Sequence, residues 1–227
     1  MGPSSTGPFV DRVVAHCRAH YGAREDEDFP RMLILSLPTP FHADRPTDHG
    51  AMRSALLGGL GELERAGVDV VGIACNTAHV YFDDLVAGVR VPVVSMVKLA
   101  VEALPARAQR VAVVGARPTL ESGIYLRALE GAGRSVVDLA CQSDVDHLLE
   151  GIRNGAASAA LDETWQRIAE RVSSEDVDAL VIACADLSAL GVGSKSVVPT
   201  VDATDCLARA LVVRWHRLAS QVSLGAP

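Results

Sequence analysis

The sequence predicts an α/β protein built on parallel β-sheets, and three observations support this fold class. First, 49% of the residues are hydrophobic, mostly Ala, Val and Leu, with 19 Gly and few aromatic residues. This composition is typical of sheets covered by helices on both faces. Second, short apolar runs alternate along the chain with stretches of helical periodicity, as in βαβ units. Third, one motif at the end of an apolar run occurs in each half of the chain.

In the first half, the boundaries of the predicted elements follow from caps and helix-breaking residues. Thr47 or Asp48 is a candidate N-cap for a helix that Gly67 ends, and Pro105 follows the last helix of this half. The predicted helices cover residues 9–20, 47–66, 81–89 and 97–104, and the predicted strands cover 31–37, 69–74 and 91–95.

The second half repeats this alternation. The predicted strands cover residues 110–115, 136–139, 179–183 and 197–201, and the predicted helices cover 120–132, 144–154, 157–172 and 202–218. Residues 105–109 are the candidate linker. We therefore predict a first domain of residues 1–104 with 205–227, and a second domain of residues 105–204.

The repeated motif places one cysteine at the end of a strand in each half. "VDVVGIACNTAH" runs from Val68 to His79, and "VDALVIACADLS" runs from Val177 to Ser188. Ligands of open parallel sheets bind beyond the carboxyl ends of the strands. Two such ends facing each other would place Cys75 and Cys184 on opposite sides of one cleft.

Two opposed thiols suit the inversion of a carbon centre. One thiolate removes the α-proton of an amino acid on one face, and the other thiol returns a proton on the opposite face. The positive end of a helix that begins after each cysteine would stabilise the thiolate and so lower the pKa of the thiol. Fixed hydrogen-bond donors would stabilise the carbanion formed on the substrate. A single buried cysteine is often only a packing residue, but two in matched motifs favour chemistry. The other three cysteines lack this context: Cys17, Cys141 and Cys206.

Several classes of function are not favoured by the composition. The net charge of −7 and the pI of about 5.5, with no basic run, argue against a nucleic-acid partner. No apolar stretch is long enough to cross a membrane, and the first ten residues do not resemble a signal peptide. The five cysteines form no CxxC pair, so we expect no metal and a cytoplasmic protein with free thiols. No phosphate-loop or GxGxxG motif is present, so we expect no cofactor.

The sequence "CNTAH" at Cys75–His79 resembles the first catalytic motif of the aspartate/glutamate racemase superfamily, in particular of its aspartate racemase branch. Further resemblances follow in the family's order along nearly the whole chain. They are "MGPSST" at 1–6, "SLPTPFHADRPT" at 36–47, "VPVVSMV" at 91–97, "VAVVGARPTLESGIYLRAL" at 111–129, "VIACAD" at 181–186 and "VPTVDAT" at 198–204. The order of these motifs is far more specific than any one of them.

The resemblance implies two pseudo-symmetric, doubly wound parallel-sheet domains with the active site in the cleft between them. It implies that Cys75 and Cys184 are the acid/base residues of a PLP-independent amino-acid racemase or epimerase, acting on aspartate, glutamate or a related amino acid. It also implies a homodimer, as is common in the family. The residues expected to bind substrate are Arg45, Asn76, Thr77, Thr119, Arg153 and Asp186. His79 is expected to cap the helix after Cys75.

Two departures from the family keep alternatives open. The second motif is Cys-Ala-Asp at Cys184–Asp186, where the family has Cys-Thr-Glu. The family also has a strand before its "MGPxAT" motif, so we expect the first domain to lack its usual N-terminal strand and to expose the edges of the neighbouring strands. The alternatives are a decarboxylase or a cis–trans isomerase of small dicarboxylates, and a non-catalytic relative that only binds its ligand.

Overall fold

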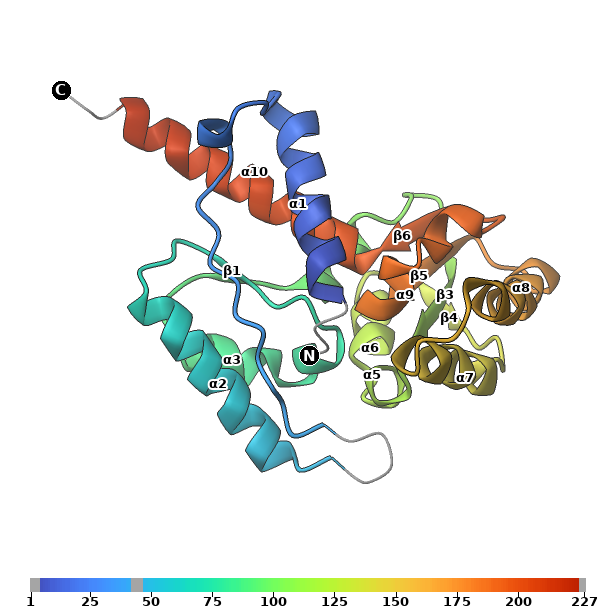
Figure 1. The fold of residues 1–227 in the computed structure, drawn as a ribbon. Helices are drawn as coiled ribbons and strands as arrows, with labels where there is room; N and C mark the ends of the chain where they lie inside the picture. Colours follow the sequence, from blue (N-terminus) through green and yellow to red (C-terminus); the bar gives the residue numbers. More distant parts are fainter. Residues whose placement is uncertain (1–4, 42–46, 225–227) are drawn as a thin grey trace. The chain divides into compact units, whose positions relative to one another are not determined.

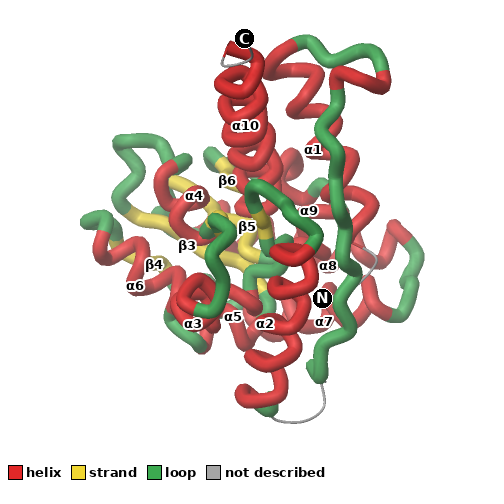
Figure 2. Tube along the Cα trace, turned by 90° about the vertical axis from the view of Figure 1, so that its left-hand side faces the viewer, coloured by secondary structure: helices red, strands yellow, loops and turns green. Residues whose placement is uncertain are grey.

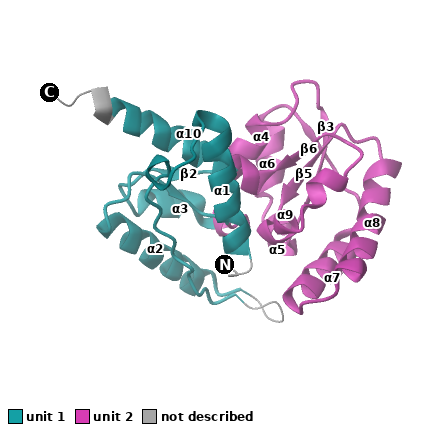
Figure 3. Ribbon diagram, turned by 45° about the horizontal axis from the view of Figure 1, so that its top comes forward, with its two compact units in different colours: residues 1–74, 81–95, 207–227 teal, residues 75–80, 96–206 magenta. Residues whose placement is uncertain are grey.

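A computed structural model describes residues 5–41 and 47–224, and it confirms an α/β fold with parallel sheets (Figure 1). The chain forms two compact units (Figure 3). Unit 1 comprises Met1–Ala74, Tyr81–Ser95 and Leu207–Pro227, and unit 2 comprises Cys75–Val80 and Met96–Cys206. Unit 2 thus includes residues that we assigned to the first domain, and the predicted domain boundaries stay a prediction. No helix of the described residues is long and apolar enough to span a membrane.

Unit 2 is built on a four-stranded parallel sheet with the order β4–β3–β5–β6. The strands are β3 (Arg110–Gly115), β4 (Ser135–Val137), β5 (Ala179–Ala183) and β6 (Thr200–Asp202). The bounds of β3 and β5 are those that the sequence predicts. The chain passes from β3 to β4 on one side and then to β5 on the other, so a topological switch point lies between β3 and β5. Ligands of such sheets bind at this point.

Helices cover both faces of this sheet. They are α4 (Met96–Glu102), α5 (Arg117–Glu121), α6 (Ile124–Gly131), α7 (Gln142–Arg153), α8 (Ser158–Ser174) and α9 (Ala185–Ala189). The core under α7 and α8 contains Val114 and Ile182 from the two central strands, with Trp165 from α8. In Figure 3, α4 and α6 lie on the other side of the strands. Burial on both faces explains why β3 and β5 are continuous apolar runs.

One helix prediction in this unit was wrong. We expected a single helix over residues 120–132, but the chain forms α5 and α6 with a break between them. The break is at Gly123, whose φ of +69° is left-handed. A residue in this conformation cannot continue a right-handed helix, and glycine adopts it at little cost.

Unit 1 is mostly helical. Its elements include α1 (Thr6–Tyr21), α2 (His49–Arg65), α3 (Phe82–Ala87) and most of α10 (Ala203–Leu224). The predicted cap of α2 is confirmed, because the Asp48 carboxylate accepts a hydrogen bond from the N–H of Ala51. Among the described residues, the sheet of this unit has two parallel strands of two residues each, β1 (Val71–Gly72) and β2 (Val93–Val94).

The predicted strand over residues 31–37 is wrong. The structure shows this segment as a loop, drawn in green in Figure 2. Its side chains include the exposed Met32, Leu33 and Ile34. β1 is likewise shorter than the predicted range 69–74. Because a strand exists only where a neighbouring backbone pairs with it, an apolar run alone does not make one.

Candidate active site

Cys184 follows β5 directly and is the N-cap residue of α9. The residue is 9% exposed. The backbone N–H groups of Asp186 and Leu187, in the first turn of α9, hydrogen-bond its thiol. The unpaired N–H groups at a helix start are natural donors to a negatively charged group. The sequence did not predict α9 itself, whose five residues are too few for a periodic pattern.

Cys75 is held in the same way. A 3-10 helix, η3 (Thr77–Tyr81), begins two residues after it. The backbone N–H groups of Thr77 and Ala78 hydrogen-bond its thiol. In both copies of the motif, the donors are therefore the second and third residues after the cysteine. The repeated sequence produces a repeated arrangement around each sulfur.

The two thiols share one electrostatic environment within unit 2. Burial raises the pKa of the Cys184 thiol to about 12, against the lowering effect of the α9 N–H groups. Burial also raises the pKa of the Cys75 thiol. The Asp186 carboxylate raises the pKa of both, and charge on Cys75 raises that of Cys184. Both thiols are therefore protonated at neutral pH in the unliganded protein, and ionising one disfavours ionising the other.

Asn76 is fixed by a tyrosine from the second half of the chain. The Tyr125 hydroxyl donates a hydrogen bond to the Asn76 Oδ1, at 2.5 Å, and both residues are 2% exposed. Burial raises the pKa of Tyr125, so the hydroxyl keeps its proton. With Oδ1 engaged, the amide has one orientation. Its Nδ2 is buried and has no hydrogen-bond partner in the described part of the chain. A buried donor of this kind is costly unless a ligand uses it.

Two further predicted site residues are in contact. The Oγ1 atoms of Thr77 and Thr119 are 2.8 Å apart. Thr119 lies on α5, just beyond the end of β3, and is fully buried. The contact joins the Cys75 motif to the edge of the sheet at which Cys184 lies.

His79 holds the backbone that follows Cys75. The N–H of Met96 donates to Nε2 at 3.1 Å, so Nδ1 carries the ring proton and donates to the Cys75 carbonyl oxygen at 2.9 Å. The imidazole is 4% exposed. His79 thus has a structural role, but its ring accepts the N–H at the start of α4 and does not cap the helix after Cys75 as we expected.

Sequence reasoning missed Tyr125 and Asp202 near the site. Tyr125 belongs to the "SGIY" stretch, but nothing in the sequence links it to Asn76, 49 residues away. Ser188, on α9, donates to the Asp202 Oδ2 at 2.6 Å, and the Asp202 Oδ1 accepts the N–H of Thr204 at the start of α10. This pair ties the Cys184 motif to the end of β6.

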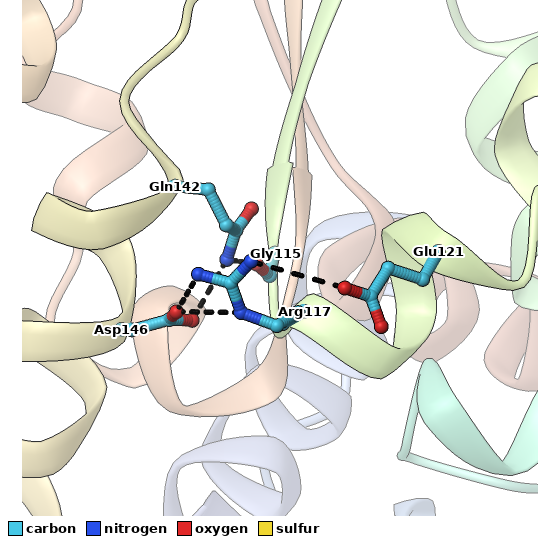
Figure 4. Close-up of polar contacts among 5 residues, drawn as sticks. All are labelled: Gly115, Arg117, Glu121, Gln142 and Asp146. Carbon is cyan, nitrogen blue, oxygen red and sulfur yellow. Dashed lines mark hydrogen bonds and ion pairs between the residues drawn. The ribbon is translucent and has the colours of Figure 1, made fainter.

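A cluster of polar side chains supports the carboxyl end of β3 (Figure 4). The Arg117 Nε donates to the Asp146 Oδ2 at 2.9 Å, which ties α5 to α7. Gln142 donates to the Gly115 carbonyl oxygen at 3.2 Å and to Asp146 at 2.8 Å. Arg117 is about half exposed, so its ion pair adds little stability. Its effect is to hold the segment that leads into Thr119.

The structure does not test the roles of the two predicted arginines. Arg45 lies outside the described residues. Arg153 is the exposed last residue of α7. Their roles in binding the substrate stay predictions.

The chain resembles known racemases over most of its length. Residues 1–211 match the family described as Asp/Glu/hydantoin racemase. The chain is 38% identical to the broad specificity amino-acid racemase RacX of Bacillus subtilis (strain 168), over 93% of each chain. It also resembles an aspartate racemase structure from Picrophilus torridus, with a TM-score of 0.78 and 25% identity over 94% of this chain and 90% of the other. An aspartate racemase homologue from Pyrococcus horikoshii OT3 has the same fold, with a TM-score of 0.73 and 24% identity over 96% and 95% of the two chains.

Proposed function

The chain belongs to the Asp/Glu/hydantoin racemase family and is an amino-acid racemase, and on this basis we propose that Cys75 and Cys184 are its two acid/base residues. The observation that carries the proposal is the matched environment of the two thiols. Each is hydrogen-bonded by the backbone N–H groups of the second and third residues after it, and both interact with the Asp186 carboxylate. Such a pair supplies one proton acceptor and one proton donor.

The proton transfers balance without a cofactor. One cysteine, as the thiolate, takes the Cα proton of the bound amino acid and becomes a thiol. The electron pair left on Cα accepts the proton of the other thiol from the opposite face, and that cysteine becomes the thiolate. The product is the other enantiomer, and the site is ready for the reverse reaction. The N–H groups at Thr77, Ala78, Asp186 and Leu187 stabilise whichever sulfur carries the charge.

Substrate binding generates the first thiolate, and the proton of that thiol is released to solvent. Both thiol pKa values are raised, so the free site is neutral at both sulfurs. The ammonium group of the substrate brings in the positive charge that favours a thiolate beside it. We assign the substrate carboxylate to Asn76, whose Nδ2 is a buried donor, with Thr77 and Thr119 beside it. Fixed donors of this kind stabilise charge that develops on the carboxylate during proton removal.

The remaining parts of the proposal concern the substrate and the assembly. The relative from Bacillus subtilis is named as a broad specificity racemase, which supports a substrate range beyond aspartate and glutamate. Arg45, Arg153 and Asp186 are proposed to select among substrate side chains. The two pseudo-symmetric domains, with the substrate between the two copies of the motif, and the homodimer are also part of this proposal.

A panel of amino acids incubated in deuterated water tests the function. Proton NMR follows the loss of the Cα signal, and chiral chromatography follows inversion. We expect the wild-type chain to invert at least one amino acid, and Cys75→Ser and Cys184→Ser each to lose at least about a hundredfold in rate. Cys141→Ser is the matched control, because Cys141 is also buried and burial also raises the pKa of its thiol. Full activity in either of the first two variants would refute the two-thiol assignment.

A further inference from the structure

The internal repeat extends beyond the two cysteine motifs. The sequence "VPVVSMV" at 91–97 matches "VPTVDAT" at 198–204 at its Val-Pro start and at its fourth residue. Each segment forms the strand that pairs in parallel with the strand before a cysteine, β2 with β1 and β6 with β5. In both copies, the residue four before the cysteine is opposite the third residue of the segment: Val71 with Val93, and Leu180 with Thr200. The two copies can therefore be compared residue by residue.

His79 and Ser188 are at matching positions, as the fourth residue after each cysteine. They are 4% and 1% exposed. Both hydrogen-bond the carbonyl oxygen of their own cysteine, His79 with Nδ1 at 2.9 Å and Ser188 with its backbone N–H at 3.0 Å. The difference follows from the helix type. In the 3-10 helix η3, the backbone N–H of His79 donates to the Asn76 carbonyl oxygen, so the imidazole satisfies the Cys75 carbonyl in its place.

Both side chains are also connected to the start of the helix that follows the neighbouring strand. The N–H groups at a helix start have no partner within the helix. In the first copy, the His79 Nε2 accepts the N–H of Met96, the first residue of α4, at 3.1 Å. In the second copy, the Ser188 hydroxyl donates to the Asp202 Oδ2 at 2.6 Å, and the Asp202 Oδ1 accepts the N–H of Thr204 in α10 at 2.9 Å. A hydroxyl and a carboxylate thus make the connection that one imidazole makes in the other copy.

Each connection fixes the short turn that surrounds a thiol. The N–H groups that hydrogen-bond the thiols belong to the second and third residues after each cysteine. They lie between the cysteine and the fourth residue, which is bonded both to the carbonyl oxygen of the cysteine and to a neighbouring helix. Because both ends of the turn are held, the N–H groups keep their direction toward the sulfur. Two chemically different side-chain sets make this same connection, which indicates that the connection itself is what the two copies share.

We propose that His79 and Ser188 are equivalent positioning residues, each of which orients the N–H donors around the cysteine of its own copy. His79 acts on Cys75, and Ser188 acts on Cys184 through Asp202. The assignment rests on the proposed function, because it takes both thiols as reacting groups. It adds that each thiol depends on its own positioning residue. A general loss of stability would affect both cysteines alike, whereas loss of one connection affects mainly one of them.

Amide hydrogen exchange of the free full-length chain tests the connections without the reaction. His79→Phe keeps a ring and removes both hydrogen bonds of the imidazole, and Ser188→Ala removes one hydroxyl. We expect each substitution to speed exchange at least about fivefold more at the amides of its own copy than at those of the other. The amides compared are those of residues 77, 78 and 96 in the first copy and 186, 187 and 204 in the second.

Further variants guard against misfolding and against nonspecific effects. His79→Gln and Asp202→Asn alter the same two connections with smaller changes of shape, and we expect the same preference for one copy from each. Ser173→Ala is the matched control for Ser188→Ala, because the exposed Ser173 hydroxyl bonds a carbonyl oxygen within α8. It should leave the amides of both copies unchanged.

A second measurement tests the effect on the reaction. Each substitution is placed in the Cys184→Ala chain, which keeps Cys75, and in the Cys75→Ala chain, which keeps Cys184. Exchange of the Cα proton of an amino acid for solvent deuterium is then followed by proton NMR. We expect His79→Phe to slow exchange by Cys75 at least about fivefold more than exchange by Cys184, and Ser188→Ala to show the opposite preference.

The outcomes separate this inference from the proposed function. Equal effects of either substitution on the two copies, in either measurement, would overturn the inference. So would unchanged amide exchange at residues 77 and 78 in His79→Phe. If amide exchange is specific to one copy but the single-thiol chains exchange no amino acid, the two connections are upheld and the proposed function is refuted.

Discussion

At the level of single residues, the proposed role of the two thiols predicts the pH dependence of the reaction. Burial raises the pKa of both cysteines, that of Cys184 to about 12. A protonated thiol cannot act as a base, so the active fraction of free enzyme grows about tenfold per pH unit below the lower of the two pKa values. We expect kcat/KM to rise throughout pH 7 to 9, as measured by circular dichroism of the amino acid. A flat profile from pH 6 to 8 would show that one sulfur is already ionised.

Asp186→Asn tests whether the charge of this carboxylate shifts the pH profile of kcat/KM. Its carboxylate raises the pKa of both thiols, and an amide keeps the shape while it removes the charge. Removing this negative charge lowers the pKa of both thiols. The rising part of the profile of kcat/KM against pH should therefore move to lower pH. The ratio of kcat/KM at pH 7 to that at pH 9 should therefore increase even if substrate binding weakens. A limb that moves to higher pH would contradict the assigned electrostatics.

Tyr125→Phe tests the hydrogen bond that orients Asn76. Without the tyrosine hydroxyl, the buried Asn76 Oδ1 loses its donor, at a cost of about 1–3 kcal/mol. The amide is then free to turn, so we expect kcat/KM to fall at least about tenfold, mostly through KM. Tyr21→Phe is the control, because it removes a hydroxyl that bonds the Asp28 carbonyl oxygen in unit 1. Equal effects of the two substitutions on KM would exclude a positioning role.

At the level of elements, the close pairing of β3 and β5 sets the position of Cys184. Gly115 is opposite Ala183, the residue before that cysteine. A Cβ at Gly115 would lie 2.7 Å from the Ala183 carbonyl oxygen, which belongs to rigid backbone. Gly115→Ala should therefore separate the strands and lower stability by about 1–3 kcal/mol, seen as a lower Tm with a loss of activity. Gly131→Ala is the control, since a Cβ at this position on α6 would have no neighbour within 4 Å. An unchanged Tm for Gly115→Ala would be inconsistent with this packing.

The elements also show which parts of the fold a sequence can predict. The strands β3 and β5 were predicted to the residue, because helices bury both of their faces and the apolar runs are continuous. The strand predicted over 31–37 does not form, because strand formation depends on a partner backbone and not on the residues alone. The helix predicted over 120–132 is broken because of one φ angle, at Gly123, and hydrophobic periodicity does not reveal such an angle.

At the level of the whole molecule, the repeated motif accounts for most of what could be predicted of the site. It singled out both cysteines as candidates, and the structure places them in one unit with Asn76, Thr77 and Thr119. The contribution of Tyr125 could not be predicted, because a contact between residues distant in sequence leaves no local pattern. The domain boundaries and the homodimer stay predictions.

The most direct test of two opposed thiols is deuterium exchange measured separately on each enantiomer. A chain with one thiol reaches one face of Cα, so it removes the proton of one enantiomer and returns deuterium to the same face. We predict that Cys75→Ala and Cys184→Ala exchange opposite enantiomers with retention, and that neither racemises. Exchange of the same enantiomer by both variants, or racemisation by either, would contradict the account.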